Sequence, residues 1–244
     1  MDLPRASVHH SASTWRQPTP PLASAERSAV VEAVARRILA CGQKRRLLVG
    51  IDGFTAAGKT SLGHELAELI TAVGRPVLRA TLDDFKNPWK DRHLYDRESG
   101  EGYYRNAYDY AAKRLLLDPC RSPAASSAVL CRIDPLTQQD HSSDATPLAS
   151  DAVLIVDGVF AFRPEINAYW DFRIWLHVDA ELSVRRGADR DQDWAGSEAE
   201  SIHRNRYLVA ERIYLEEVVV LLVEPDTTCR SGPRTPHFAG GRCL

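Results

Sequence analysis

Residues 47–66 read LLVGIDGFTAAGKTSLGHEL, and this stretch decides the fold. Its centre, Gly53 to Thr60, fits G-x-x-x-x-G-K-[ST] at every fixed position. The apolar run before it predicts a buried strand, and the apolar residues spaced three and four apart after it predict a helix. A strand, a glycine-rich loop and a helix in this order are typical of a loop that binds the phosphates of a nucleoside triphosphate.

The residue types of this loop match the chemistry of phosphate binding. Glycines let the backbone turn tightly, so that its N–H groups approach phosphate oxygens, and the positive end of the following helix dipole faces the same oxygens. Lys59 can reach the β- and γ-phosphates, and the hydroxyl of Thr60 can bind Mg²⁺. We therefore expect ATP and Mg²⁺ as cofactors. The expected ATP-binding residues of the loop are Gly53, Ala56, Ala57, Gly58, Lys59, Thr60 and Ser61.

Length and charge narrow the class of protein. A chain of 244 residues can form one large α/β domain. With 31 basic and 33 acidic residues the net charge is −2, which gives no electrostatic reason to expect a nucleic acid or a membrane as a partner. No apolar run approaches the ~18 residues of a membrane span, and no apolar signal core is present.

The cysteines bear on the compartment. There are five, an odd number, and they form no C-x-x-C pair. Without a signal core they indicate reduced thiols, so we expect a cytoplasmic protein that acts on a small-molecule substrate. The sequence leaves the oligomeric state open, with a homo-oligomer as one option.

Composition divides the chain into three parts. Residues 1–23 contain four prolines and several serines and predict a disordered leader. Residues 24–223 carry the strand and helix patterns and predict a single domain. Residues 224–244 are rich in Pro, Gly, Thr and Arg and predict an unstructured tail.

Hydrophobic periodicity and turn signals predict the remaining elements of the domain. Helices are predicted over residues 25–41, from Asn106 to Leu117 before Asp118–Pro119, and from a capping box at Ser197 and Glu200 to about Val218. The buried face of the first helix is expected to hold Val30, Val31, Val34 and Ile38. Strands are predicted over residues 76–82, 128–133, 152–156, 172–178 and 218–223. Strands that alternate with helices predict an α/β fold.

Acidic residues follow two of the predicted strands. Asp83 and Asp84 follow residues 76–82, and open α/β sheets bind their ligands at the carboxyl ends of their strands. A turn would explain these aspartates if they stood alone, but beside a phosphate-binding loop we expect a catalytic carboxylate. Asp157 follows the continuous apolar run 152–156. An acidic residue at this place can hold the Mg²⁺ shell.

Two polar segments are candidates for contacts with the substrates. Residues 86–105 form a stretch too long for a mere connection, so we expect the start of an acceptor pocket there, with a solvated excursion as the alternative. Residues 181–193 carry arginines, which near a transferred phosphoryl group stabilise the charge of the transition state. Without the nucleotide motif they would be a solvated helix face. These arginines are Arg185, Arg186 and Arg190.

Four stretches carry a family resemblance. I-D-G-F-T-A-A-G-K-T, T-L-D-D-F, V-L-I-V-D-G-V-F-A-F and R-R-G-A-D-R-D, in this order, resemble the uridine kinase family and, more broadly, its group with phosphoribulokinase and pantothenate kinase. The resemblance covers roughly residues 46–216. It implies a P-loop three-layer α/β/α fold with a parallel central sheet and a lid. It also implies an ATP-dependent kinase that phosphorylates the 5′-hydroxyl of uridine or cytidine.

The resemblance assigns roles to single positions. Asp83 falls at the catalytic base, which accepts the proton of the acceptor hydroxyl, and Lys59 and Thr60 fall at the phosphate lysine and the Mg²⁺ ligand. Asp157 falls where the family has an acidic residue before Gly. The three arginines of residues 181–193 fall in the lid.

The acceptor side is implied less directly. Asp134 and Thr137 resemble part of a hairpin that borders the nucleoside. Tyr103 and Tyr104 stand where the uridine-binding stretch typically has an Asp-His pair, and Gln138 stands where a histidine is usual. The expected substrate contacts are therefore Asp83, Tyr103, Tyr104, Asp134 and Thr137.

Two alternatives remain open. One is the same chemistry on another hydroxyl, such as that of pantothenate or a sugar. The other is a nucleotide-binding regulatory protein without turnover. No N-K-x-D guanine motif is present, which disfavours a GTPase switch, and Asp83 favours a kinase because a switch needs no acceptor base.

The loop lysine gives a first test. We expect Lys59→Ala to abolish nearly all phosphoryl transfer, because charge stabilisation in a dry site contributes several kcal/mol to the rate. Initial rates of ATP-dependent transfer measure this loss. Transfer within tenfold of the wild-type rate would remove the loop from the mechanism.

Overall fold

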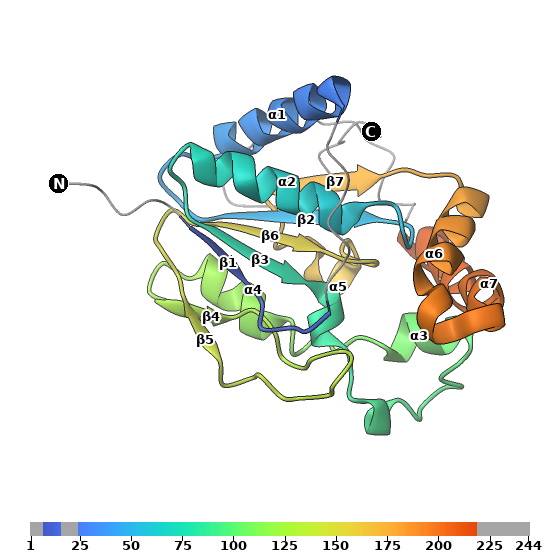
Figure 1. Cartoon of the computed structure of the whole chain (residues 1–244). Coiled ribbons are helices and arrows are strands. Elements are labelled where there is room, and N and C mark those ends of the chain that lie inside the picture. The colour runs from blue at the N-terminus through green and yellow to red at the C-terminus, as the bar shows by residue number, and fades with distance from the viewer. Residues whose placement is uncertain (1–6, 16–23, 219–244) are drawn as a thin grey trace.

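The fold is built on a five-stranded sheet in which every pairing is parallel. The computed structural model describes residues 7–15 and 24–218. The strand order is β1-β3-β6-β2-β7 (Figure 1). The strands are β1 (Val8–His10), β2 (Leu47–Gly53), β3 (Val77–Thr81), β6 (Val153–Asp157) and β7 (Phe172–Leu176).

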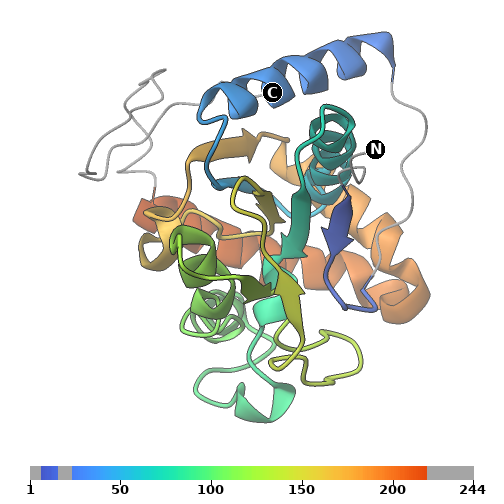
Figure 2. The same ribbon diagram turned by 90° about the vertical axis from the view of Figure 1, so that its left-hand side faces the viewer.

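Helices cover both faces of this sheet, and a lid lies beyond the carboxyl ends of its strands (Figures 1 and 2). One face carries α1 (Ala25–Ala40) and α2 (Lys59–Ala72). The other face carries α3 (Gly100–Asn106), α4 (Arg114–Arg121), α5 (Pro164–Asn167) and α8 (Leu208–Val218). The lid contains α6 (Ala180–Ala195) and α7 (Ala199–Ile202). The predicted three-layer α/β/α fold with a parallel central sheet is thus confirmed.

The central strands explain the two hydrophobic cores. Every residue of β2 and β6 is buried, as continuous apolar runs in a parallel sheet should be. Successive side chains point to opposite faces. Leu48 therefore packs in the core under α4 and α8, whereas Leu47 and Val49 pack in the core under α1 and α2.

The prediction of a disordered leader is wrong for residues 7–15, which contain the strand β1. β1 pairs in parallel with β3, from Val8 opposite Val77 to His10 opposite Arg79. Its three residues have no apolar pattern of their own, so only the free edge of the neighbouring strand makes them a strand. The rest of the predicted leader, and the tail 224–244, lie outside the described residues.

Several predicted boundaries in the α-helical parts are wrong. Asn106 is the last residue of α3 and begins no helix, and α4 runs through Pro119 instead of stopping before it. Ser197 caps nothing: residues 196–198 form a 3₁₀ turn, and α7 leads through a π-helical turn, residues 203–207, into α8. Val30 of α1 is exposed, whereas the other three predicted core residues of this helix are buried.

A small second sheet lies next to α4. Its strands β4 (Ser127–Val129) and β5 (Ala145–Pro147) pair antiparallel. The predicted strand 128–133 therefore continues as a loop after Val129. A predicted last strand, 218–223, falls almost wholly outside the described residues.

The cysteines and helices bear on two further expectations. Cys120 and Cys131 are buried free thiols, as expected. In the parts of the chain that the structure describes, no helix is both long and apolar enough to cross a membrane.

Candidate active site

The phosphate-binding loop follows β2 directly. Gly53 has a φ of 142°, and a Cβ there would lie 2.4 Å from the carbonyl oxygen of Leu176, so the close pass of β7 requires glycine. α2 begins at Lys59 after Gly58, which offers no side chain to cap the helix. The first N–H groups of α2 are thus available to an anion. The buried amine of Lys59 donates to the carbonyl oxygens of Gly53 (3.0 Å) and Phe54 (2.8 Å).

A buried carboxylate fixes the start of this loop. Asp52 is fully buried and accepts hydrogen bonds from the backbone N–H groups of Gly53 (2.7 Å), Phe160 (3.1 Å) and Phe162 (3.1 Å). The hydroxyl of Tyr214 donates a fourth bond at 2.5 Å. Burial raises the pKa of Asp52, and these donors partly offset the rise. The end of β2 is thereby tied to the segment after β6 and to α8.

A second carboxylate from α8 reaches the same loop. Glu211 is buried and accepts from the hydroxyl of Thr55 at 2.7 Å. Burial raises its pKa to about 7, despite the Thr55 bonds and the charge of Lys59. Burial lowers the pKa of Lys59, and the charges of Glu211 and Asp52 oppose that effect. The lysine therefore sits in a charge-compensated pocket before any phosphate arrives.

The two predicted Mg²⁺ ligands lie together. The hydroxyl of Thr60 donates to Asp157 Oδ2 at 2.6 Å, and Arg79 Nη2 contacts Asp157 Oδ1 at 2.7 Å. Mg²⁺ prefers hard oxygen ligands and binds proteins through one or two of them, with substrate phosphates and waters completing the octahedron. A threonine hydroxyl and a carboxylate in direct contact, at the start of α2, fit that requirement.

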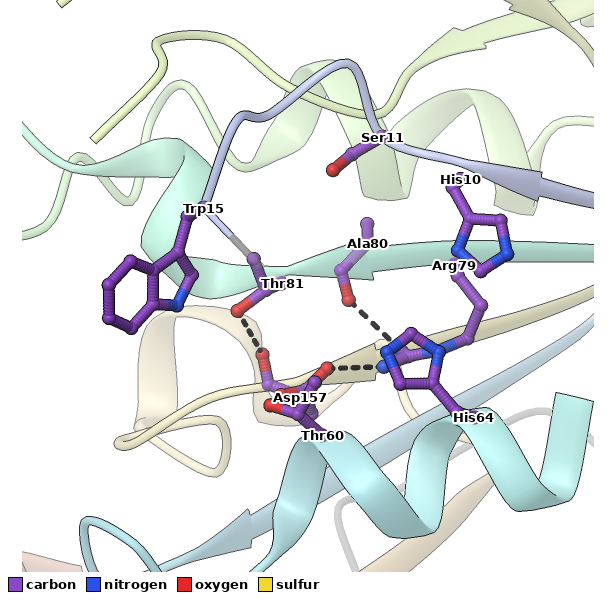
Figure 3. Close-up of a pocket in the computed structure, with 9 residues that line it drawn as sticks. All are labelled: His10, Ser11, Trp15, Thr60, His64, Arg79, Ala80, Thr81 and Asp157. Carbon is purple, nitrogen blue, oxygen red and sulfur yellow. Dashed lines mark hydrogen bonds and ion pairs between the residues drawn. The ribbon is translucent and has the colours of Figure 1, made fainter. Parts of the chain in front are cut away.

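A cavity opens beside this pair. Its volume is about 290 Å³ (Figure 3). It is lined by residues of β3, β6, α2 and the N-terminal segment: His10, Ser11, Trp15, Thr60, His64, Arg79, Ala80, Thr81 and Asp157. Both oxygen ligands are thus reachable from one hollow.

Asp83 and Asp84 follow the strand as predicted, and they lie in a 3₁₀ turn, Leu82–Phe85, directly after β3. Asp83 keeps some exposure and pairs with Lys86 at 2.8 Å, while the hydroxyl of Tyr108 donates to it at 3.0 Å. Burial alone would raise the pKa of Asp83, but Lys86, Tyr108 and Lys59 outweigh burial and lower it to about 2. Asp83 is therefore an ionised carboxylate at neutral pH, within the field of the loop lysine.

Asp84 faces the interior. Its side chain is fully buried, and neither carboxylate oxygen has a hydrogen bond of normal geometry. Burial raises its pKa to about 7, with smaller contributions from the charges of Asp83 and Asp157, although the nearby hydroxyls of Ser11 and Ser13 partly offset the rise.

Only one of the three predicted lid arginines turns inward. Arg185 and Arg186 are exposed on α6. Arg190 forms two hydrogen bonds with Asp191, at 2.6 and 2.8 Å. Burial would lower the pKa of Arg190, but Asp191, and more weakly Asp83, raise it. Arg190 therefore lies within the electrostatic reach of Asp83.

The residues predicted to contact the substrate do not all lie together in the structure. Tyr103 joins the Asp83 network, because its hydroxyl lies 3.0 Å from that of Tyr108. Tyr104 instead packs in the core and donates to Glu217. The structure does not gather Asp134 and Thr137 at this network.

The carboxylate of Asp134 is occupied by hydrogen bonds from backbone N–H groups. It accepts from the backbone N–H groups of Leu136 (2.8 Å), Thr137 (2.9 Å) and Thr14 (2.6 Å). Burial would raise its pKa, but these bonds outweigh burial and hold the pKa well below its usual range. Its carboxylate thus anchors the N-terminal segment.

Sequence reasoning missed several residues of the site. Lys86 stands three positions after Asp83, a spacing that suits contact across one helical turn and could have suggested the pair. Tyr108 and Glu211 had no such local signal, because only tertiary packing brings them to the loop and to Asp83. Trp15 and Arg79 were missed for the same reason.

These features define a class and then a family. A parallel sheet, a phosphate-binding loop after the central strand β2, and acidic residues at the carboxyl ends of β6 and β3 define an α/β P-loop protein. The model of the phosphoribulokinase / uridine kinase family matches residues 48–213, more than half of the chain. The chain belongs to this family, as the resemblance in its sequence indicated.

Individual relatives are distant. The chain is 24% identical to a uridine kinase of Halobacterium salinarum over 155 residues, which are 63% of this chain and 66% of that protein. It is 26% identical to a uridine kinase of Staphylococcus haemolyticus over 163 residues, 66% of this chain and 75% of that protein. A solved structure, a possible uridine kinase from Bacillus stearothermophilus, matches with a TM-score of 0.60 at 24% identity, covering 80% of this chain and 96% of that one. This structural match concerns the fold.

The buried Asp84 predicts a pH-dependent stability. Its pKa is raised in the folded state, to about 7 against 3.8, so between these values the folded protein binds the proton more tightly than the unfolded chain. Its contribution to stability therefore falls as the pH rises, by up to about 1.4 kcal/mol per pH unit. We expect wild type to lose at least about 1 kcal/mol relative to Asp84→Asn between pH 5 and pH 7.5. Urea unfolding of both proteins at the two pH values measures this.

A matched control is Asp140→Asn. Asp140 is exposed, and hydrogen bonds from Ser142 lower its pKa, so it titrates below this window. The difference between wild type and Asp140→Asn should not change between pH 5 and pH 7.5. An equally constant difference for Asp84→Asn would contradict the raised pKa.

Proposed function

We propose that the protein is a Mg·ATP-dependent kinase that transfers the γ-phosphoryl group to a hydroxyl of a small molecule. The observation that carries the proposal is the meeting of two groups: a phosphate-binding loop with Lys59, and an ionised carboxylate, Asp83, at the end of β3. The two side chains lie close enough for each charge to shift the pKa of the other. A nucleotide switch has no need of the second group. Membership of a family of small-molecule kinases supports the same reaction.

Each group has a part in the transfer. The N–H groups at the start of α2 and the amine of Lys59 would bind the β- and γ-phosphates. Thr60 and Asp157 would hold Mg²⁺, which would supply positive charge beside the phosphates. The carboxylate of Asp83 accepts the hydrogen bond, and then the proton, of the attacking hydroxyl. Arg190 stabilises the negative charge that spreads over the transferred group.

The ion pair between Asp83 and Lys86 fits a positioning role for the base. A pKa of about 2 keeps Asp83 ionised at neutral pH, so that its carboxylate can orient the hydroxyl toward the phosphorus and then accept its proton. Tyr108, which donates to Asp83, and Tyr103 behind it fix that orientation.

For the acceptor we propose the 5′-hydroxyl of uridine or cytidine, because the named relatives are uridine kinases. The second candidate is another small alcohol, such as pantothenate or a sugar, and the departures from the family pattern at Tyr103 and Gln138 favour it.

A panel of acceptors tests the proposal. ATP consumption would be measured with Mg²⁺ and, in separate assays, uridine, cytidine, purine nucleosides, pantothenate and simple sugars. We expect turnover with at least one hydroxyl compound and formation of its phosphate ester. Binding of ATP without turnover on any acceptor would favour the regulatory alternative.

The adjacent aspartates give a paired prediction. Asp83→Asn keeps the shape of the side chain and removes the proton acceptor, so kcat should fall by ~10²–10⁴-fold while ATP binds with near-normal affinity. Asp84→Asn is the matched control, since Asp84 is fully buried and does not line the cavity, so that this change should cost far less in kcat. Steady-state kinetics and calorimetric ATP titrations measure both. Normal turnover of Asp83→Asn together with an inactive Asp84→Asn would reverse the assignment.

A further inference from the structure

The N-terminal segment 7–15 is anchored at three places. β1 pairs with β3, and the N–H group of Ser11 continues that pairing by donating to Arg79 O at 3.0 Å. The N–H group of Thr14 donates to Asp134 at 2.6 Å, and Ser13 is buried. These contacts fix the path of the backbone, and therefore the place of Trp15, the last described residue of the segment.

This segment forms one wall of the cavity beside the Mg²⁺ ligands. Figure 3 shows His10, Ser11 and Trp15 on one side of the hollow and Thr60 and Asp157 on the other. The wall comes from a part of the chain that precedes the phosphate-binding loop and carries none of the family motifs.

Trp15 also reaches the lid. The guanidinium carbon of Arg190 lies 5.8 Å from the centroid of the Trp15 ring, a distance at which a cation is attracted to an indole face. The cavity and Arg190 thus share one aromatic side chain.

The other side of Arg190 is held by a buried pair. Asp191 binds Arg190 through both oxygens and also contacts His203 Nε2 at 2.8 Å. His203 belongs to the π-helical turn and fills the space above Gly187, where a Cβ would come within 2.2 Å of its ring. Isolated π-turns often mark functional sites. The lid arginine is therefore clamped between this pair and the indole.

We propose that Trp15 is a positioning residue, which holds Arg190 over the phosphoryl-transfer site by a cation–π contact. The proposal rests on the proposed kinase function and extends it to a segment outside the family match. A guanidinium clamped on both sides loses little conformational freedom when it binds the transferring phosphoryl group, so its stabilisation of the transition state is larger.

Variants at Trp15 and Arg190 test the proposal. Trp15→Leu should lower kcat/KM for ATP roughly 3- to 30-fold, the range of a partly desolvated cation–π contact. Trp15→Phe should recover part of this loss, because phenylalanine keeps a weaker aromatic face. The control is Trp194→Leu, which removes an exposed tryptophan from the same lid helix and should change nothing. Melting temperatures of all variants should stay near that of the wild type.

A double-mutant cycle separates positioning from other roles. Starting from Arg190→Met, the further change Trp15→Leu should alter kcat/KM less than twofold, since there is no guanidinium left to position. A full additional loss in that background would show that Trp15 acts independently of Arg190 and would overturn the proposal. A gain of activity in Trp15→Leu would show instead that the segment blocks the site, and would overturn it as well.

Failure of the kinase proposal is distinguished by a binding assay. If wild type transfers phosphate to no acceptor, the proposed function is wrong. The four proteins of the cycle (wild type, Trp15→Leu, Arg190→Met and the double variant) are then titrated with Mg²⁺ and a non-hydrolysable ATP analogue. Trp15→Leu should then weaken binding in the wild-type background and leave it unchanged in Arg190→Met. Equal weakening in both backgrounds would reject the contact between Trp15 and Arg190 as the cause.

Discussion

The site depends on the buried carboxylate of Asp52. Its four donors come from three separate parts of the chain: the phosphate-binding loop, the segment after β6 and α8. Such a carboxylate is costly to bury without donors. Asp52 therefore holds three parts of the chain in one relative arrangement: the phosphate-binding loop, the segment after β6 and α8. Contacts within the protein thus hold the start of the loop in shape.

The same constraint explains how charges are kept inside the site. Asp157 is paired with Arg79 and Asp83 with Lys86, because an unpaired buried charge would be strongly destabilising. Lys59 differs, since it donates to the neutral carbonyl oxygens of its own loop. Phosphate oxygens would replace these neutral acceptors with charged ones, which form stronger hydrogen bonds. The lysine is therefore the group whose interactions improve most when a nucleotide binds.

Features that depend on a local sequence pattern could be predicted from the sequence. The loop at Gly53–Thr60 was predicted from its motif and the flanking apolar pattern. Thr60 and Asp157 were each assigned to Mg²⁺ from the sequence, and the structure places the two side chains in contact. Helix ends were missed where tertiary packing overrides local signals: Pro119 lies inside α4, and Ser197 caps nothing. Tyr108, which donates to Asp83, was missed because it stands 25 residues away and no periodicity relates the two. Asp134 shows the reverse case, in which a residue assigned by resemblance has its carboxylate filled by backbone N–H groups.

The N-terminal segment shows why composition misleads most at a sheet edge. Without β1, the described residues would leave β3 at the edge of the sheet with unpaired backbone groups, and almost any short segment that reaches such an edge can pair with it. β1 is short and polar, so its strand conformation comes from β3 and not from its own residues. Because β3 ends at Thr81, beside the cavity and just before Asp83, a segment that pairs alongside β3 is led directly to the cavity and the lid. The edge that makes the strand therefore also places Trp15 beside Arg190.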